Sequence, residues 1–202
     1  AARIVKPETN ALVEAINALA GDSAALERMS RAASRLADGI GAIRVSQAVG
    51  ELPCARDGQA VRLRPVTAED SDLLLELQRK PETRRFARNR NIPSQAEHTC
   101  WMRGKLYDPG CFMNLILLGE TPAGVARLDR LPEGYEVSIA VDPAYFRLGI
   151  GGITLTLLHQ LVPEADLLAH VASDNIASRS LFERAGYSEA EQSGWLRQRG
   201  LS

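Results

Sequence analysis

The amino-acid sequence predicts an α+β domain, in which helices flank a mixed and mostly antiparallel sheet, preceded by an N-terminal helical hairpin. Three observations support this fold class. Apolar and polar residues alternate in several short segments of the second half of the chain, as expected for half-buried strands. Other segments carry leucines at helical spacing. Finally, 45% of the 202 residues are hydrophobic, which is enough to bury a core.

Residues 1–53 are predicted to form a helical tail. Two sets of apolar residues recur at helical spacing, Leu12, Val13, Ile16 and Leu19 in the first and Leu26, Met29, Ala33 and Leu36 in the second. Gly21 ends the first helix, and Asp22 or Ser23 caps the next one. A hairpin of this size cannot bury its own apolar stripes, so we expect it to pack on another surface.

Residues 54–202 are predicted to form the main domain, after a stretch at 51–59 that looks like a linker. An alternating segment at 60–66 predicts the first strand of this domain. Two sequences of the capping-box type, TAED at 67–70 and SQAE at 94–97, predict the starts of two helices.

The rest of the domain predicts three successive strands and then a helix, a strand, a helix and a hairpin. The three strands are expected at 111–119, 122–131 and 135–141, with glycine, proline and glutamate between them. A glycine-rich turn leads into an apolar helix, which is followed by a strand at 165–171 and a helix at 175–186. This order of elements is typical of an α+β domain with a mixed sheet.

Charge and cysteine content narrow the range of functions. The formal net charge of −1 gives no global field that would favour nucleic acid or an anionic membrane as a partner. Cys54, Cys100 and Cys111 have no metal-ligand spacing and cannot all pair, which favours a cytoplasmic location. The sequence has no signal peptide and no apolar run long enough to cross a bilayer. Because it does not begin with methionine, it fits a trimmed chain or the tail of a longer protein.

The turn RLGIGG, residues 147–152, removes side chains where the apolar helix begins. A dinucleotide-binding turn needs G-x-G-x-x-G inside a βαβ unit, and a P-loop needs Gly-Lys followed by Ser or Thr; neither pattern is present. Two interpretations remain. The exposed amides of the helix N-terminus bind a pyrophosphate without a metal, or the glycines simply mark the start of the helix.

Three segments, taken in order, resemble the GNAT superfamily of acetyl-CoA-dependent N-acetyltransferases. VRLRPVTAEDSDLLLELQ resembles the opening strand and helix of that family, and EVSIAVDPAYFRLGIGGITL resembles its acetyl-CoA motif. NIASRSLFERAGY resembles its asparagine-bearing helix followed by Gly-Phe. The resemblance covers residues 60 to about 200 and implies acetyl-CoA as co-substrate, with no metal. It also implies a fourth strand that splays from the fifth, with the pantetheine arm between them.

By this resemblance, the residues that bind acetyl-CoA lie on the fourth strand, in the glycine turn and at the start of the last helix. They are Ile139, Val141, Arg147, Leu148, Gly149, Ile150, Gly151, Gly152, Asn175 and Ser178. The basic residue of the family motif should stand at position 146, which is Phe146, whereas the arginine stands at 147. The backbone amides are therefore expected to carry the phosphate contact. Helix capping is the alternative interpretation of Asn175 and Ser178.

Acetyl transfer requires a group that removes a proton from the amine and one that protonates the leaving thiolate. Glu136, at the start of the fourth strand, is the candidate base, directly or through water; the alternative is a solvated carboxylate at a strand end. Many GNAT enzymes carry a tyrosine as the acid where this chain has Phe182. Tyr187 and Tyr145 are therefore the candidate acids, although Tyr187 also matches a family aromatic that serves packing.

The segment at 81–102 combines four arginines within seven residues with aromatic side chains. The spacing of Arg84, Asn89, Ile92, His98 and Trp101 resembles GNAT enzymes of nucleotide-sugar pathways, particularly the acetyltransferase of pseudaminic acid synthesis. That resemblance implies a UDP-linked amino sugar as acceptor, with arginines on the diphosphate and aromatic faces on rings. The alternative is a solvated basic face.

Residues 1–50 resemble the C-terminal end of the UDP-sugar hydrolase of the same pathway, which has a glycosyltransferase-like fold. Its pattern DG-x-GA-x-RV occurs here at 38–45. These resemblances lead us to expect an N-acetyltransferase that acts on the amino group of a UDP-linked amino sugar. The alternatives are a protein N-terminal acetyltransferase and a degenerate GNAT domain that binds coenzyme A without catalysis. The sequence leaves a homodimer open.

Overall fold

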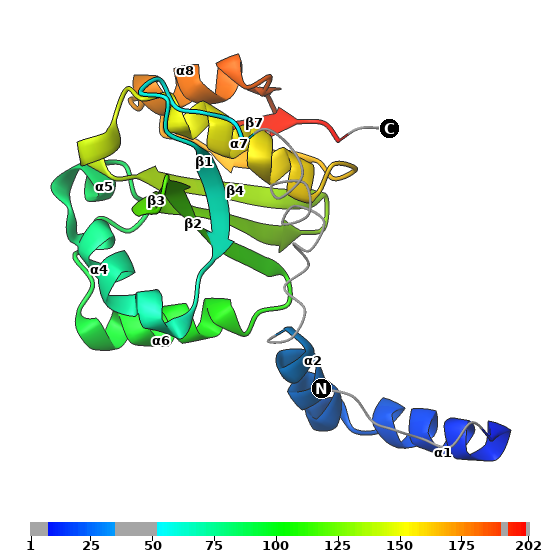
Figure 1. Cartoon of the computed structure of the whole chain (residues 1–202). Coiled ribbons are helices and arrows are strands. Elements are labelled where there is room, and N and C mark those ends of the chain that lie inside the picture. The colour runs from blue at the N-terminus through cyan, green and yellow to red at the C-terminus, as the bar shows by residue number, and fades with distance from the viewer. Residues whose placement is uncertain (1–7, 35–51, 191–193, 201–202) are drawn as a thin grey trace.

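The computed structural model describes residues 8–34, 52–190 and 194–200 of the chain (Figure 1). Its helices are α1 (Thr9–Ala20), α2 (Ser23–Ser34), η1 (Ala68–Asp70), α4 (Ser71–Arg79), α5 (Pro81–Arg85), α6 (Gln95–Leu106), η2 (Pro143–Tyr145), α7 (Ile150–Leu161) and α8 (Ile176–Arg184). Its strands are β1 (Val61–Pro65), β2 (Cys111–Leu118), β3 (Thr121–Leu131), β4 (Gly134–Val141), β5 (Leu167–His170), β6 (Ser188–Glu189) and β7 (Trp195–Gln198).

The strands form one seven-stranded sheet in the order β1-β2-β3-β4-β5-β7-β6. Every neighbouring pair is antiparallel except β4 with β5, which is parallel. The predicted α+β fold with a mixed and mostly antiparallel sheet is therefore confirmed, including the three successive strands and the closing hairpin.

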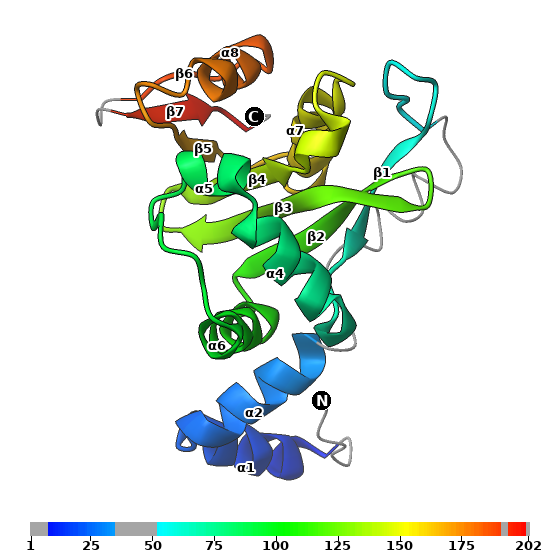
Figure 2. The same ribbon diagram turned by 90° about the vertical axis from the view of Figure 1, so that its left-hand side faces the viewer.

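Helices cover both faces of this sheet (Figure 2). The central strand β2 has a nearly continuous apolar sequence because both of its faces are buried. Met113, Leu115 and Leu117 pack with α4 and α6, whereas Ile116 and Leu118 pack with α7 on the opposite face. Each such fully buried aliphatic side chain contributes about 1.5–3 kcal/mol relative to an exposed one.

Both predicted capping boxes occur in the structure and start helices on the α4–α6 side of the sheet. Thr67 pairs with Asp70 at the start of η1, and Ser94 pairs with Glu97 at the start of α6. Asp70 also receives hydrogen bonds from Arg64, which join this helix start to β1. The short helix α5, between the two boxes, has no clear periodic signal in the sequence.

The helical hairpin α1–α2 forms as expected, but its apolar stripe remains exposed. Leu12, Val13, Ile16 and Leu26 are 45–63% exposed, contrary to the expectation that another surface covers them. Leu36 and the motif at 38–45 lie outside the described residues.

The predicted linker contains a small folded element. Cys54 and Ala60 form a β-bridge, and the turn between them is closed by hydrogen bonds from Ala55 N to Gln59 O (2.8 Å) and from Gly58 N to Ala55 O (2.9 Å). Ala55 is only 5% exposed and belongs to the main core. These residues are therefore part of the domain.

Candidate active site

Strands β4 and β5 pair over only two residue pairs and then separate. Tyr135 lies beside Leu167 and Glu136 beside Leu168, although β4 continues to Val141 and stays paired with β3 throughout. Past Glu136, the β5-facing edge of β4 therefore offers backbone N–H and C=O groups that no described strand satisfies. Ile139 and Val141 lie in this open stretch, which could hold an extended polar ligand.

The turn between η2 and α7 has two residues in left-handed conformations. Gly149, the N-cap of α7, has φ 83°, and Arg147 has φ 65°. Glycine adopts this conformation freely, but for arginine it is uncommon and costly. Together they turn the chain so that Ile150 begins the helix, and the first helical hydrogen bond runs from Ile153 N to Gly149 O (3.3 Å). The preceding amides at the start of α7 make no intrahelical bond and can bind an anion.

The glycines at the start of α7 serve different purposes. A Cβ at Gly151 would meet Leu181 of α8 at 3.0 Å, so glycine at this position permits close packing of α7 on α8. A Cβ at Gly152 would meet nothing within 4 Å. The side-chain position of Gly152 is open space beside the free amides and leaves room for an anion, whereas that of Gly151 is filled by Leu181.

Asn175 caps α8, since its side-chain oxygen accepts a hydrogen bond from Ser178 N (3.2 Å). The capping interpretation of Asn175 is therefore confirmed, whereas Ser178 contributes only its backbone amide to the cap. The amide N–H groups of the Asn175 side chain have no partner among the described residues, so Asn175 could also donate to a ligand.

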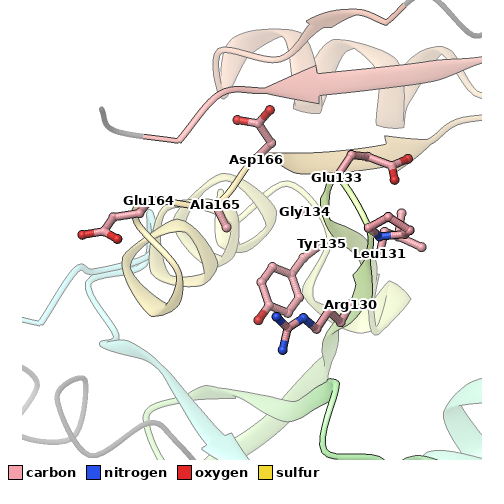
Figure 3. A pocket seen from close by; sticks show the side chains of 9 residues that line it. Arg130, Leu131, Glu133, Gly134, Tyr135, Glu164, Ala165 and Asp166 are labelled. Atoms are coloured by element: carbon pink, nitrogen blue, oxygen red, sulfur yellow. The ribbon is translucent and has the colours of Figure 1, made fainter.

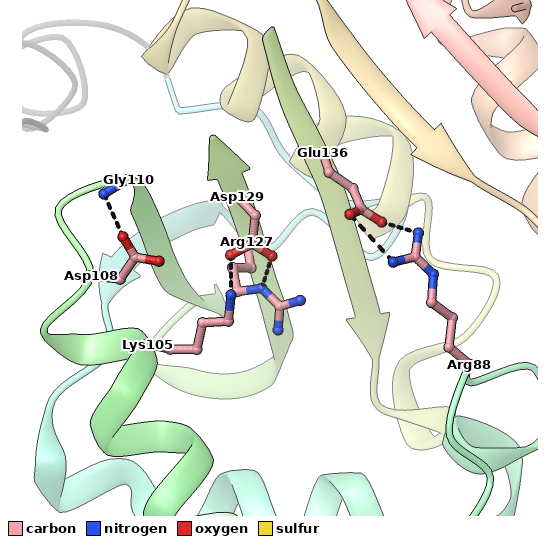
Figure 4. A network of polar contacts seen from close by, with 7 residues as sticks. All are labelled: Arg88, Lys105, Asp108, Gly110, Arg127, Asp129 and Glu136. Atoms are coloured by element: carbon pink, nitrogen blue, oxygen red, sulfur yellow. Dashed lines mark hydrogen bonds and ion pairs between the residues drawn. The ribbon is translucent and has the colours of Figure 1, made fainter. Parts of the chain in front are cut away.

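Glu136 lies on the α4–α6 face of the sheet, where Arg88 covers it (Figure 4). Arg88 Nη1 lies 3.4 Å from Glu136 Oε2, and Arg88 Nη2 contacts Glu136 Oε1. The guanidinium also lies over the ring of Trp195, 5.4 Å from its centroid. The side chain of Glu136 is 17% exposed and that of Arg88 is 58% exposed. The carboxylate is thus sheltered, and the side chain that covers it lies on the solvent side.

A second carboxylate, Asp129, occupies the neighbouring position on β3. Lys105 Nζ donates to it at 2.7 Å and Arg127 Nε at 2.6 Å. Burial opposes ionisation of Asp129, but the hydrogen bonds from Lys105 and Arg127 outweigh that cost and lower its pKa. Burial also raises the pKa of the nearby Cys111 thiol to about 12, so this thiol stays protonated at neutral pH.

A family model described as an acetyltransferase (GNAT) domain matches residues 60–188. This chain belongs to the GNAT acetyltransferase family. The predicted GNAT resemblance, fold and acetyltransferase class are therefore confirmed. No curated protein sequence matches the chain.

Several solved acetyltransferases share the fold of this GNAT domain at low sequence identity. An acetyltransferase from Thermus thermophilus is 20% identical, with a TM-score of 0.61 over 68% of this chain and 96% of that one. The ribosomal L7/L12 alpha-N-protein acetyltransferase RimL in complex with coenzyme A is 17% identical, with a TM-score of 0.61 over 69% and 94%. The spermidine N-acetyltransferase from Vibrio cholerae in complex with coenzyme A and spermine is 15% identical, with a TM-score of 0.59 over 68% and 92%.

Most of the predicted acceptor residues of this GNAT domain are engaged within the protein. Arg84 Nη1 donates to the carbonyls of Asn89 (3.0 Å) and Asn91 (3.3 Å), so it clamps the loop before α6. His98 is only 1% exposed, and its Nδ1 lies 3.1 Å from Gln78 Oε1. These two residues therefore support the fold, and direct acceptor contact is not expected of them.

Among the predicted acceptor residues, Trp101 does lie beside the charged side chains around Asp129 and Glu136. Its ring centroid lies 5.6 Å from the guanidinium carbon of Arg127 and 5.6 Å from the His98 ring. Four charged residues that sequence reasoning missed, Arg88, Lys105, Arg127 and Asp129, surround Glu136 together with Trp101; this surface is called the acceptor face below because it is the candidate site for an acceptor.

Tyr187, the candidate acid, is 4% exposed in the core. Its ring meets Phe182 edge-on at 4.9 Å, and its hydroxyl has no partner in the part of the chain that the structure describes. Burial raises its pKa, so the phenol stays neutral. This environment favours the packing interpretation of Tyr187.

A hollow of about 630 Å³ lies at the start of β4, away from the stretch where β4 separates from β5 (Figure 3). Its lining residues are Arg130, Leu131, Pro132, Glu133, Gly134, Tyr135, Glu164, Ala165 and Asp166. Asp166 is held there by Arg197 and by the amide of Gly200. This hollow includes neither the glycine turn nor Glu136.

Metal binding and membrane insertion can be assessed for residues 8–34, 52–190 and 194–200. These residues contain no group of three or more His, Cys, Asp or Glu side chains that could hold a metal ion. No helix among them has the length and apolar character needed to cross a membrane.

Proposed function

We propose that this GNAT domain transfers the acetyl group of acetyl-CoA to the amino group of a nucleotide-linked amino sugar, in a pathway to a nonulosonic acid such as pseudaminic acid. The observation that carries the proposal is the sheltered carboxylate of Glu136, placed where β4 leaves β5 and on the face that α4 and α6 cover. A base at this point is adjacent to the open strand edge and still reachable from solvent.

Main-chain groups would hold acetyl-CoA, both on β4 where it separates from β5 and in the glycine turn. Acetyl-CoA supplies the acetyl group as a thioester. Ile139 and Val141 provide backbone groups that no described strand pairs with, and the amides at the start of α7 provide an anion-binding site, called the anion seat below.

The acceptor amine attacks the thioester carbonyl, and Glu136 accepts the amine proton directly or through water. The carbon–sulfur bond breaks, and coenzyme A leaves as a thiolate that takes a proton from water. Because Arg88 holds both oxygens of Glu136, the acceptor must displace Arg88 before the carboxylate can act.

The composition of the acceptor face supports an anionic, ring-bearing acceptor. Arg88 and Arg127 each lie over a tryptophan ring, Trp195 and Trp101 respectively. Guanidinium groups bind phosphates through paired hydrogen bonds, and aromatic faces stack on bases or sugars. Arg88 thus replaces Arg84 as the proposed contact with the nucleotide diphosphate. The resemblance of residues 1–50 to the end of a UDP-sugar hydrolase favours the same pathway.

An acceptor screen tests this function. Purified protein is given acetyl-CoA with UDP-linked 4-amino sugars, the same sugars without nucleotide, N-terminal peptides and polyamines, and free thiol release is measured. We expect the highest kcat/KM on a UDP-linked amino sugar. Acetylation of peptides alone would instead establish a protein N-terminal acetyltransferase. Binding of coenzyme A with no turnover on any amine would point to a domain without catalysis.

A further inference from the structure

The turn that begins α7 is contacted by a segment 91 residues earlier in the chain. Arg56 N donates to Leu148 O at 2.9 Å, and Arg56 Nη1 donates to Arg147 O at 3.2 Å. A Cβ at Gly149 would lie 3.9 Å from Arg56 Cγ. The side chain of Arg56 therefore runs alongside the glycine turn.

The segment that carries Arg56 is held firmly. The β-bridge of Cys54 with Ala60 closes it, and Gly58, with φ 82°, makes its tight turn. The neighbouring residue Ala55 is buried in the main core. Arg56 is thus positioned by packing on one side and by the carbonyl of Leu148 on the other, while its side chain stays exposed.

The charges at this point are unbalanced. A guanidinium offers five N–H donors, and Arg56 directs one nitrogen to the carbonyl of Arg147. Within the described ranges, no carboxylate forms an ion pair with Arg56 or Arg147. The positive end of the α7 dipole lies at the same turn. The adjacent carboxylate, Asp57, accepts hydrogen bonds from Gln59 instead. The Arg56 guanidinium and the positive helix end therefore lie at one turn without a paired acid, and a bound anion would interact favourably with both.

We propose that Arg56 is a phosphate ligand for coenzyme A and replaces the basic residue that is missing at position 146. Phe146 stands at that position, 51% exposed, and cannot donate a hydrogen bond from its side chain. The inference rests on the proposed function, because it needs coenzyme A at the start of α7. Arg56 enters this site from outside the family motif, through the hairpin that precedes β1.

The alternative role of Arg56 is purely structural: its hydrogen bond to the carbonyl of Arg147 holds the turn in shape and makes no contact with a ligand. The salt dependence of coenzyme A binding separates the two roles, because a residue that only shapes the turn makes no ion contact with the ligand and leaves that dependence unchanged. Calorimetry would compare coenzyme A, dephospho-coenzyme A and S-acetylpantetheine, which carries no phosphate, on wild type, Arg56→Gln and Arg56→Lys. Arg103→Gln is the matched control, since Arg103 is an exposed arginine on α6 with no side-chain partner among the described residues.

We expect Arg56→Gln to weaken coenzyme A binding about tenfold or more and to reduce its dependence on salt, with S-acetylpantetheine unaffected. Arg56→Lys should lose less coenzyme A affinity, because lysine keeps the positive charge and lacks only the paired donors of the guanidinium. A loss that persists with dephospho-coenzyme A assigns Arg56 to the pyrophosphate; a loss that disappears assigns it to the 3′-phosphate.

Equal coenzyme A affinity in wild type and Arg56→Gln overturns the role of Arg56 and leaves the proposed function standing. A loss of coenzyme A affinity with an unchanged dependence on salt, or an equal loss on S-acetylpantetheine, overturns it as well, in favour of the structural role. If wild type itself does not bind coenzyme A, both proposals fail. Thermal unfolding of each variant without ligand shows whether the fold is retained.

Discussion

Asp129 and Glu136 face each other in register across β3 and β4, so their carboxylates lie on the same face of the sheet. Their partners differ. Asp129 is held by Lys105 and Arg127 at ordinary hydrogen-bond distances, whereas Glu136 is held by Arg88, whose side chain is more than half exposed. A ligand can therefore displace Arg88 and free the carboxylate of Glu136, whereas the carboxylate of Asp129 stays paired.

Glu136→Gln should lower kcat by about 10²–10⁴-fold, because a general base contributes on that order and the amide cannot accept the proton. Coenzyme A affinity, measured by calorimetry, should stay within about twofold of wild type, since Glu136 faces away from the glycine turn. Near-normal kcat across the pH range would remove Glu136 from the mechanism.

Arg88→Ala should separate acceptors by charge. We expect kcat/KM for a UDP-linked amino sugar to fall about tenfold, the loss expected for one charged hydrogen-bonding contact. The same sugar without nucleotide should lose nothing, because Glu136 no longer has to be uncovered. Arg85→Ala is the control from the same segment, since its guanidinium lies 5.0 Å from the Phe86 ring. A similar change on both sugars would show that Arg88 only supports the loop.

Gly152→Glu should abolish most coenzyme A binding while the fold is kept. The new side chain enters open space beside the free amides of α7 and places a carboxylate where the phosphates are expected. We expect a loss of at least about tenfold, or roughly 1.4 kcal/mol, by calorimetry.

Gly151→Ala should behave in the opposite way. Its Cβ would press on Leu181 at 3.0 Å, so the variant should unfold at lower temperature and, once folded, bind coenzyme A nearly normally. If both glycine variants change only stability, the anion seat lies elsewhere.

His98 should make the stability of the domain depend on pH. Burial lowers its pKa below the usual 6.5, so the unfolded chain takes up this proton before the folded one does. The free energy of unfolding should therefore fall as the pH drops below about 6.5 and through the folded pKa. Between pH 7.5 and 5.5, wild type should lose at least about 2 °C more in Tm than His98→Gln. Equal losses in both proteins would place the responsible group elsewhere.

Local sequence patterns were sufficient for most of the fold. The capping boxes at Thr67 and Ser94 fixed the starts of two helices because a side chain three residues away completes each one. The hairpin between β3 and β4 was also predictable in register, since Leu131 pairs with Gly134 across a two-residue turn. Counting back from that turn pairs Asp129 with Glu136, so the sequence does contain a signal for Asp129.

The acceptor face was harder to predict because arginines carry no signal of their partners. Arg84 and Arg88 look equivalent in the sequence, yet one holds its own loop and the other reaches β4, 48 residues away. The spacing of His98 and Trp101 predicts a ligand-binding role for His98, but the packing of α4 on α6 buries its side chain. Such choices depend on tertiary contacts that local periodicity does not contain.

The hairpin at 54–60 shifts the practical boundary of the domain. The family match begins at residue 60, so a deletion designed on that match would retain every motif residue and still remove Ala55 from the core and Arg56 from the Leu148 carbonyl. The shortened protein would keep its sheet and lose the support that holds the turn before α7. Any minimal version of this enzyme should therefore start no later than residue 53, ahead of the first residue that the family model recognises.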